Sequence, residues 1–443
     1  MKNVALIPPE WLSRSAIYQV NPRTFSKDGT IKAIMDELPF LKELGFGVIY
    51  LCPIFKEDVC SDQNSWSTRQ KASGTNNPKN PYRINDYFSI DEEYGTLEDL
   101  QKFTHKAHEL EMKVIFDLVY AHIGPEASII KRHPEFVMQN ADGSFVTTEW
   151  NFPALDFKCE GLREYLYCNM VYYVAVCDVD GFRCDVGDAV PIDFWKEAKR
   201  RITEVKPDCV LINEGSKFEN QAIAFDVTYT FDWHEALYKI FCEGESAKLL
   251  QQQWETYHGL APLNALLLRD IDNHDTVTDW PARTESAASH EGMEQIITVN
   301  YLIDGVPMVY TGNEIADTSR ISMFANRFYP GNFEVTARNA KSTTESLKRQ
   351  ETIKKLNMLK RESDVLRYGE TIWLDDYCSD NIIAFKRRLG NHEIVFIGNT
   401  RNEPCEIPLK HIPENILLGT AKKSGGNLFF EPYRYIVFSI KNT

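Results

Sequence analysis

Polar residues with catalytic potential end or follow four short apolar segments of the 443-residue sequence. The segments are 113–119, 181–185, 209–213 and 265–271. The residues are Asp117, His122, Arg183, Asp185, Glu214, His274 and Asp275. If the segments are parallel strands of a barrel, these side chains meet at the mouth formed by the C-terminal strand ends. The carboxylates of Asp185, Glu214 and Asp275 would then share one site with imidazole and guanidinium groups.

Two carboxyl groups on neighbouring strands could cleave a glycosidic bond. Retaining glycosidases hold such a pair about 5–5.5 Å apart, one ionised as nucleophile and one protonated to release the leaving group. Arg183 and Asp185 are two residues apart on one strand, so their side chains face the same way. We expect the guanidinium to keep Asp185 ionised as the nucleophile, and a shielded Glu214 to serve as the acid. Asp275 would hold sugar hydroxyls.

Each of these residues taken alone has a structural explanation. A buried Arg-x-Asp pair is more often a structural ion pair than a catalytic one, and a lone histidine such as His122 or His274 is usually satisfied within the core or rim. Selection for stability alone would rarely give polar clusters at four strand ends in the order that this chemistry requires. Their conjunction therefore favours an active site.

Eight β-rich segments alternate with amphipathic helical segments, which predicts an α/β fold, a (β/α)8 TIM barrel. The predicted strands are 16–20, 47–51, 113–119, 181–185, 209–213, 224–231, 265–271 and 307–311. The predicted helices include 31–44, 97–110, 192–204 and 291–302. A doubly wound sheet is the alternative, but the turn after the first segment lacks the glycines of a phosphate-binding loop.

Two long insertions and a change in the pattern of predicted secondary structure indicate how the chain is divided into domains. Loops of more than about 12–15 residues within a compact domain are usually functional, and the sequence has them at 56–81 and 122–160. After a helix at 344–361, short alternating strands are separated by Gly and Asn turns. The predicted divisions are a barrel over 1–121 and 161–362, a small subdomain inserted after strand three over 122–160, and a C-terminal antiparallel β domain over 363–443.

Composition limits the partners and the cellular location. Lys and Arg total 49 against 64 Asp and Glu, and the resulting charge of −15 repels polyanions, so we expect no nucleic acid partner. No apolar run has membrane-spanning length and the N-terminus lacks a signal-peptide core, which predicts a cytoplasmic protein without a membrane partner. The 10 scattered cysteines fit reduced thiols. Neither a Cys-x-x-Cys pair nor a His-Glu-x-x-His helix is present to signal a zinc site.

Four segments, in this order, resemble the short conserved regions of glycoside hydrolase family 13, the α-amylase family. They are 117–122 (DLVYAH), 181–185 (GFRCD), 212–214 (INE) and 272–275 (DNHD). Two further segments, 17–25 and 81–96, are similar to the N-terminal half of that family, and the second includes Tyr82. The resemblance covers about residues 15–315. It implies a barrel, a subdomain after strand three, a C-terminal β domain and retaining chemistry on α-glucosides.

The resemblance also implies roles for individual residues. Asp185 matches the nucleophile, Glu214 the acid/base and Asp275 the carboxylate that grips the 2- and 3-hydroxyls of the sugar. The remaining matches are Arg183 as partner of the nucleophile, His122 and His274 as ligands of sugar hydroxyls, and Tyr82 as the stacking aromatic.

The sequence departs from the family at its calcium site. Ala121 stands where the family usually has Asn, and Ala154 where it often has Asp. Neither side chain can bind a cation. We therefore predict that the protein has no metal site and needs no cofactor.

The expected activity is hydrolysis of short α-glucosides inside the cell, from the chain end, on an oligosaccharide or disaccharide substrate. A transglycosylase or phosphorylase of the same family remains an alternative, because the chemistry up to the glycosyl-enzyme is shared. A non-catalytic relative is the third alternative, and the intact Asp185, Glu214 and Asp275 argue against it. Linkage preference and oligomeric state stay open.

Overall fold

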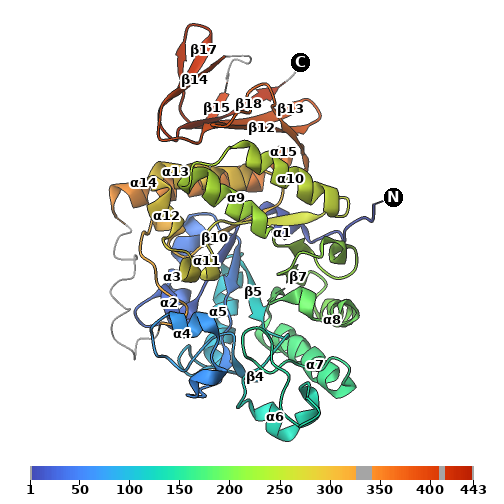
Figure 1. Ribbon diagram of the computed structural model, residues 1–443. Helices are drawn as coiled ribbons and strands as arrows, with labels where there is room; N and C mark the ends of the chain where they lie inside the picture. The colour runs from blue at the N-terminus through green and yellow to red at the C-terminus, as the bar shows by residue number, and fades with distance from the viewer. Residues whose placement is uncertain (1, 326–341, 409–414, 442–443) are drawn as a thin grey trace.

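The structure is a computed structural model that describes residues 2–325, 342–408 and 415–441 (Figure 1). Eight parallel strands close a barrel, paired around it in the order β1, β10, β9, β8, β7, β6, β5, β2. They are β1 (Ile17–Val20), β2 (Val48–Leu51), β5 (Lys113–Leu118), β6 (Gly181–Cys184), β7 (Val210–Asn213), β8 (Val227–Thr228), β9 (Leu266–Arg269) and β10 (Val306–Tyr310). The predicted (β/α)8 barrel is therefore confirmed.

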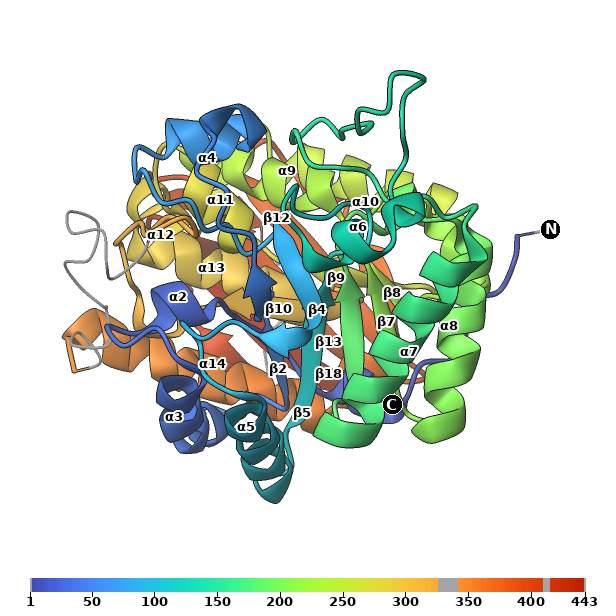
Figure 2. The same ribbon diagram turned by 90° about the horizontal axis from the view of Figure 1, so that it is seen from below.

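Helices lie around these strands, as Figure 2 shows from below. The longer ones are α3 (Ile31–Glu43), α5 (Leu97–Glu109), α7 (Glu160–Cys177), α8 (Ile192–Val205), α9 (Phe231–Cys242), α10 (Lys248–Leu260), α13 (Ser289–Leu302) and α14 (Thr344–Glu362). Helix starts follow capping chemistry, since the side chains of Thr96 and Asp99 form a capping box that begins α5. The four predicted helices are confirmed, with ends that differ by one or two residues.

Two apolar layers hold the barrel together. Its interior is filled by branched side chains from alternate strand positions, such as Ile17, Val48, Ile115 and Val306. Strand residues of the opposite face, such as Phe182, pack against the surrounding helices in a larger cluster. Because both faces are buried, the strands read as continuous apolar runs in the sequence.

The sixth barrel strand is shorter than the sequence indicates. The segment predicted over 224–231 contains only the two-residue strand β8, and Phe231 already begins α9. The β-branched and aromatic residues of this segment favour extended structure. Packing overrides that preference, because α9 buries Trp233 and Leu237 in the layer between barrel and helices.

The insertion after β2 has its own secondary structure. Strands β3 (Phe55–Glu57) and β4 (Ile84–Ile90) form an antiparallel pair, and the short helix α4 (Thr68–Ala72) lies between them in sequence. Residues between β5 and α7 contain α6 (Ser128–Arg132) and isolated bridges such as His122 with Ala154. Both insertions leave the barrel at the C-terminal ends of its strands.

The C-terminal part of the chain forms two antiparallel sheets, red in Figure 1. The larger contains β11 (Glu370–Trp373), β12 (Ile382–Leu389), β13 (His392–Asn399), β18 (Tyr435–Lys441) and β15 (Asn415–Gly419), after the short helix α15 (Asp364–Tyr368). The smaller contains β14 (Cys405–Pro408), β17 (Asn427–Phe430) and β16 (Lys422–Ser424). The Gln295 side chain of α13 donates to the Asn399 carbonyl and connects the barrel to the larger sheet.

Neither a membrane span nor a disulfide is found in the described residues. None of the helices in those ranges combines the length and the apolarity that crossing a bilayer requires. All ten cysteines fall within the described ranges and carry free thiols.

Candidate active site

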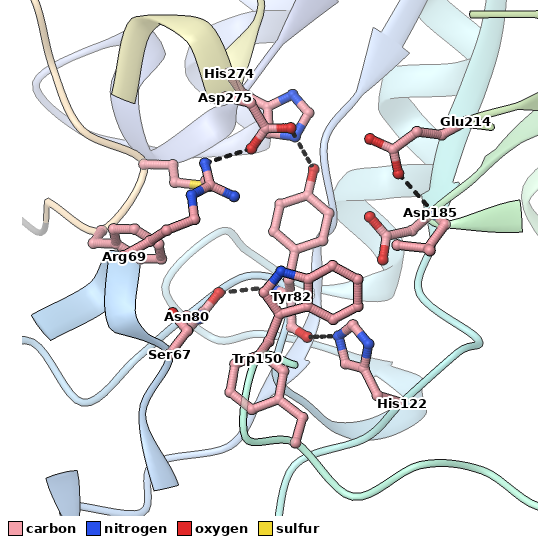
Figure 3. A pocket seen from close by; sticks show the side chains of 14 residues that line it. Ser67, Arg69, Asn80, Tyr82, His122, Trp150, Asp185, Glu214, His274 and Asp275 are labelled. Carbon is pink, nitrogen blue, oxygen red and sulfur yellow. Dashed lines mark hydrogen bonds and ion pairs between the residues drawn. The ribbon is translucent and has the colours of Figure 1, made fainter. Parts of the chain in front are cut away.

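Strand register brings the predicted residues to one end of the barrel. Asp117 of β5 lies beside Arg183 of β6, and Cys184 of β6 lies beside Asn213 of β7. Asp185 and Glu214 each follow that last pair by one residue, so neighbouring strands deliver them side by side. Figure 3 shows both carboxyl groups at the same wall of a pocket.

Arg183 binds three carboxyl groups at once. Its Nη1 lies 2.7 Å from Asp117 Oδ1 and 2.8 Å from Asp185 Oδ1, and its Nη2 contacts Glu214 Oε1 at 2.5 Å. The guanidinium is fully buried, and its central carbon lies 5.7 Å from the centre of the Tyr229 ring. A single positive charge therefore organises all three acidic groups.

Burial and the Arg183 charge act in opposite directions on the pKa of Asp185. Burial raises the pKa of Asp185 well above its usual value, and the nearby Glu214 carboxyl adds to this effect. The Arg183 guanidinium lowers the pKa of Asp185, but burial is the larger effect. Burial also raises the pKa of Glu214. Burial therefore raises the pKa of both carboxyl groups in the pocket.

A strained residue orients Glu214. Val186, directly after Asp185, has a left-handed backbone with φ of 43°, which is rare for a β-branched side chain. In that conformation its backbone N–H donates to Glu214 Oε2 at 2.7 Å, and the N–H of Gly187 donates to the Glu214 carbonyl. Such strain costs about 1–3 kcal/mol and clusters at functional sites.

His274 and Asp275 begin the short helix α11 (His274–Asp279), which follows β9. The side chain of Asn273 accepts from the backbone N–H groups of Asp275 and Thr276, and the Thr276 hydroxyl accepts from the Asn273 N–H. This capping box fixes the first turn of α11. Burial opposes ionisation of Asp275, but His274 and Arg69 outweigh it and lower its pKa.

A hydrogen-bond chain sets the tautomer of His274. Gln19 Nε2 donates to His274 Nδ1 at 2.9 Å, so the ring proton is on Nε2 and points to Tyr82 Oη, 2.6 Å away. The Tyr82 hydroxyl in turn donates to Asp117 Oδ2 at 2.9 Å. Burial lowers the pKa of His274, which keeps the ring neutral. The Tyr82 and His274 rings stack with centroids 5.2 Å apart.

His122 presents an acceptor nitrogen. Its Nε2 donates to the Tyr82 carbonyl at 2.9 Å, which leaves Nδ1 unprotonated and without a hydrogen-bond partner in the described structure. Burial lowers the pKa of His122 to about 4. The ring contacts Trp150 and Phe152, with ring centroids 5.4 and 5.0 Å away. A buried acceptor of this kind suits a hydroxyl donor from a ligand.

These residues surround a narrow cavity of about 90 Å³, shown in Figure 3. The predicted residues Tyr82, His122, Asp185, Glu214, His274 and Asp275 line it, while Arg183 supports the wall from behind. Sequence reasoning missed the other lining residues. They are Ser67, Arg69, Asn80, Trp150, Phe152, Val186, Met323 and Phe324. Most come from the two long insertions, and the length of these insertions was the only feature of the sequence that indicated a functional role.

The residues at the position of the family's calcium site do not fit a cation. Ala121 and Ala154 provide only backbone oxygens, and both are already engaged. The Leu155 N–H donates to the Ala121 carbonyl, and the Met138 N–H donates to the Ala154 carbonyl. Within the described ranges, no three His, Cys, Asp or Glu residues are grouped as a metal site requires.

Known sequences of one family match most of this chain. The family model for the α-amylase catalytic domain matches residues 19–152 and 140–365. A cyclomaltodextrinase of Thermoanaerobacter pseudethanolicus is 23% identical, over 96% of this chain and 77% of its own length. An intracellular maltogenic amylase of Bacillus subtilis is also 23% identical, over 91% of this chain and 71% of its own length.

Solved structures share the fold. An alpha-amylase from Lactobacillus plantarum has a TM-score of 0.79 at 23% identity, covering 97% of this chain and 99% of that one. A maltogenic alpha-amylase from Thermotoga neapolitana has the same TM-score at 24% identity, covering 98% and 100%. Because the family model spans the barrel and its strand-end carboxylates, this chain belongs to the α-amylase family, glycoside hydrolase family 13, and is a glycoside hydrolase acting on O-glycosyl bonds.

Proposed function

We propose that this enzyme hydrolyses short α-glucosides with retention of configuration, using Asp185 as nucleophile and Glu214 as acid/base. The observation that carries the proposal is the arrangement around Arg183, which holds both carboxyl groups at one wall of a pocket. Two carboxyl groups held this close can flank a glycosidic bond, so that one attacks the anomeric carbon from the face opposite the leaving group and the other protonates the leaving oxygen. The raised pKa of Glu214 agrees with a protonated acid.

In the first step, an Asp185 oxygen attacks the anomeric carbon and Glu214 gives its proton to the departing oxygen. A covalent glycosyl-enzyme forms as the glycosidic bond breaks. In the second step, Glu214 takes a proton from water, which attacks the same carbon and frees Asp185. The raised pKa of Glu214 favours the protonated acid that the first step requires.

The remaining lining residues suit the recognition of one sugar ring. Asp275 is ionised and can accept from two hydroxyls, and His122 Nδ1 can accept from another. Tyr82 offers an aromatic face. The relatives named cyclomaltodextrinase and intracellular maltogenic amylase support short α-glucosides as substrates and a cytoplasmic location.

The anomeric form of the first product tests this proposal. Two inversions at one carbon give retention, so proton NMR of maltose hydrolysis should show α-glucose before mutarotation. Initial release of β-glucose would contradict the proposal. Parallel reactions with and without inorganic phosphate should give the same free sugar, whereas sugar phosphate would indicate a phosphorylase.

A further inference from the structure

The guanidinium of Arg69 lies across the pocket between two carboxylates. Its Nη2 donates to Asp275 Oδ1 at 2.6 Å, and its Nε lies 2.9 Å from Asp279 Oδ2. Asp275 and Asp279 are four residues apart on α11, so they lie on one face of that helix. Arg69 therefore joins the insertion after β2 to the helix after β9.

Arg69 is held in place by its own helix. Ser67 caps α4 by accepting from the Gln70 N–H, and the buried Gln70 side chain donates to the Asn77 carbonyl. The Asn80 side chain connects this turn to the pocket, since it contacts Gln70 and accepts from the Tyr82 N–H. The arginine thus projects from an anchored turn.

Arg69 and the reacting carboxyl groups lie at opposite sides of the pocket. In Figure 3, Asp185 and Glu214 lie at one wall, Arg69 lies at the other, and Asp275 lies between them. The leaving group must lie beside Glu214, which protonates it. Asp275, which binds the sugar beside the anomeric carbon, also contacts Arg69. Arg69 is therefore nearest to the non-reducing end of the bound ring.

We propose that Arg69 closes the non-reducing end of the pocket, so that the enzyme accepts one terminal glucosyl unit and removes it from the chain end. This inference rests on the proposed function and names its substrate class. A second sugar attached to the non-reducing side would have to pass through the space between Arg69 and α11. The ion pairs to Asp275 and Asp279 keep that space closed.

The test compares two substrates that differ by one sugar. With para-nitrophenyl α-glucoside, nitrophenol leaves when one ring occupies the pocket. With para-nitrophenyl α-maltoside, direct release of maltose and nitrophenol requires room for a second ring. Chromatography of initial products separates that direct cleavage from stepwise removal of glucose. The ratio of the two kcat/KM values cancels general losses of activity.

Variants at and beside the ion pairs complete the test. Arg69→Ala removes the barrier, and Asp279→Asn releases one anchor of the guanidinium while leaving Asp275 intact. Lys71→Ala is the matched control, because Lys71 is an exposed cation on the same helix. We expect the wild type and Lys71→Ala to favour the glucoside by about ten-fold or more, as for other pocket contacts, and Arg69→Ala and Asp279→Asn to shift the ratio toward the maltoside.

Two results would overturn the inference about Arg69 and leave the proposed function intact. One is a wild-type enzyme that releases maltose as efficiently as glucose, and the other is an Arg69→Ala variant with an unchanged ratio. Absence of hydrolysis of both substrates by folded wild type would instead contradict the proposed function, and the inference with it.

Discussion

Arg183 determines how charge is distributed among the acidic residues. Its Nη1 is shared by Asp117 and Asp185, and its Nη2 contacts Glu214. The i, i+2 spacing along a strand was enough to predict the contact with Asp185. It could not predict the direction in which the pKa of Asp185 shifts, because this depends on burial and on carboxyl groups from other strands.

Asp185→Asn should remove the nucleophile and leave the fold. We expect kcat/KM on para-nitrophenyl α-glucoside to fall by roughly four orders of magnitude, on the scale of losing a covalent catalyst. The melting temperature should stay close to that of the wild type, since Arg183 retains Asp117 and Glu214. Asp36→Asn on the exposed side of α3 is the matched control. Near-normal turnover by Asp185→Asn would contradict the assignment.

Glu214 should set the alkaline limit of activity. Burial raises its pKa, so the protonated acid persists to higher pH than a free glutamic acid, and kcat/KM falls as pH rises through that raised pKa. Glu214→Gln cannot lose this proton, so its alkaline decline should disappear. Measurement on maltose and on para-nitrophenyl α-glucoside should show a larger loss for maltose, whose leaving group needs protonation.

Azide offers an independent check on Glu214. The anion needs no general base to attack the glycosyl-enzyme, so it should partly restore turnover of the variant on the activated substrate. Equal losses on both substrates, an unchanged alkaline decline and no effect of azide would together argue against Glu214 as acid/base.

At the scale of elements, the long, strongly patterned segments could be predicted and the short ones could not. Helices such as α3 and α5 show regular apolar spacing, and their predicted and observed bounds nearly coincide. The insertion at 56–81 has no such pattern. Strand β3 exists through its pairing with β4, further along the chain, and Arg69 of α4 pairs with Asp275 and Asp279 of the distant α11. Arg69 was therefore missed as a pocket residue.

Arg83 holds that insertion together from within. Its fully buried guanidinium donates to the carbonyls of Asp58, Cys60 and Pro78 and to the Ser65 hydroxyl. Arg83→Met keeps the aliphatic stem but removes these hydrogen bonds and the ion pair to the Asp58 carboxylate, which keeps only the backbone donors of Cys60 and Glu126. Loss of a buried charged partner should lower the free energy of unfolding by about 3–5 kcal/mol.

Urea denaturation and limited proteolysis would measure this effect. Cleavage within residues 58–78 should accelerate, and KM should rise because α4 and Arg69 lose their support. Arg200→Met is the control, because its ion pairs to Glu197 and Glu204 are exposed and contribute little. If Arg83→Met resembled this control, the insertion would not depend on Arg83.

At the scale of the whole molecule, the order of strand-end motifs predicted the barrel and the position of its pocket. Asp185, Glu214 and Asp275 come together because a closed parallel barrel places successive strand ends around one mouth. The divisions at 121/122, 160/161 and 362/363 stay predictions. The part of the wall that includes Trp150 and Phe324 could not be predicted, because it is formed by loops whose paths depend on tertiary packing.

A calcium ion of the family type would bind where the barrel meets the insertion after β5, at Ala121 and Ala154. Calcium requires six to eight oxygen ligands, and two side-chain oxygens are missing here. The backbone oxygens do not compensate, because the Ala121 and Ala154 carbonyls accept from Leu155 and Met138. Asp156 is the nearest acidic side chain in sequence, and its Oδ1 accepts from the Lys158 N–H. Hydrogen bonds between the segments thus connect the insertion to the barrel.

Chelation should therefore leave this enzyme unchanged. An ion that bound only the folded state would stabilise it by mass action, so its removal would lower the melting temperature. We expect excess EDTA to alter neither Tm nor kcat/KM on para-nitrophenyl α-glucoside, and added calcium to raise neither. A drop in Tm that calcium restores would show that oxygens other than those of Ala121 and Ala154 bind the ion. Replacing Asp156 with Asn would then reveal whether its carboxylate is one of them, because the amide keeps the turn to Lys158 but weakens cation binding.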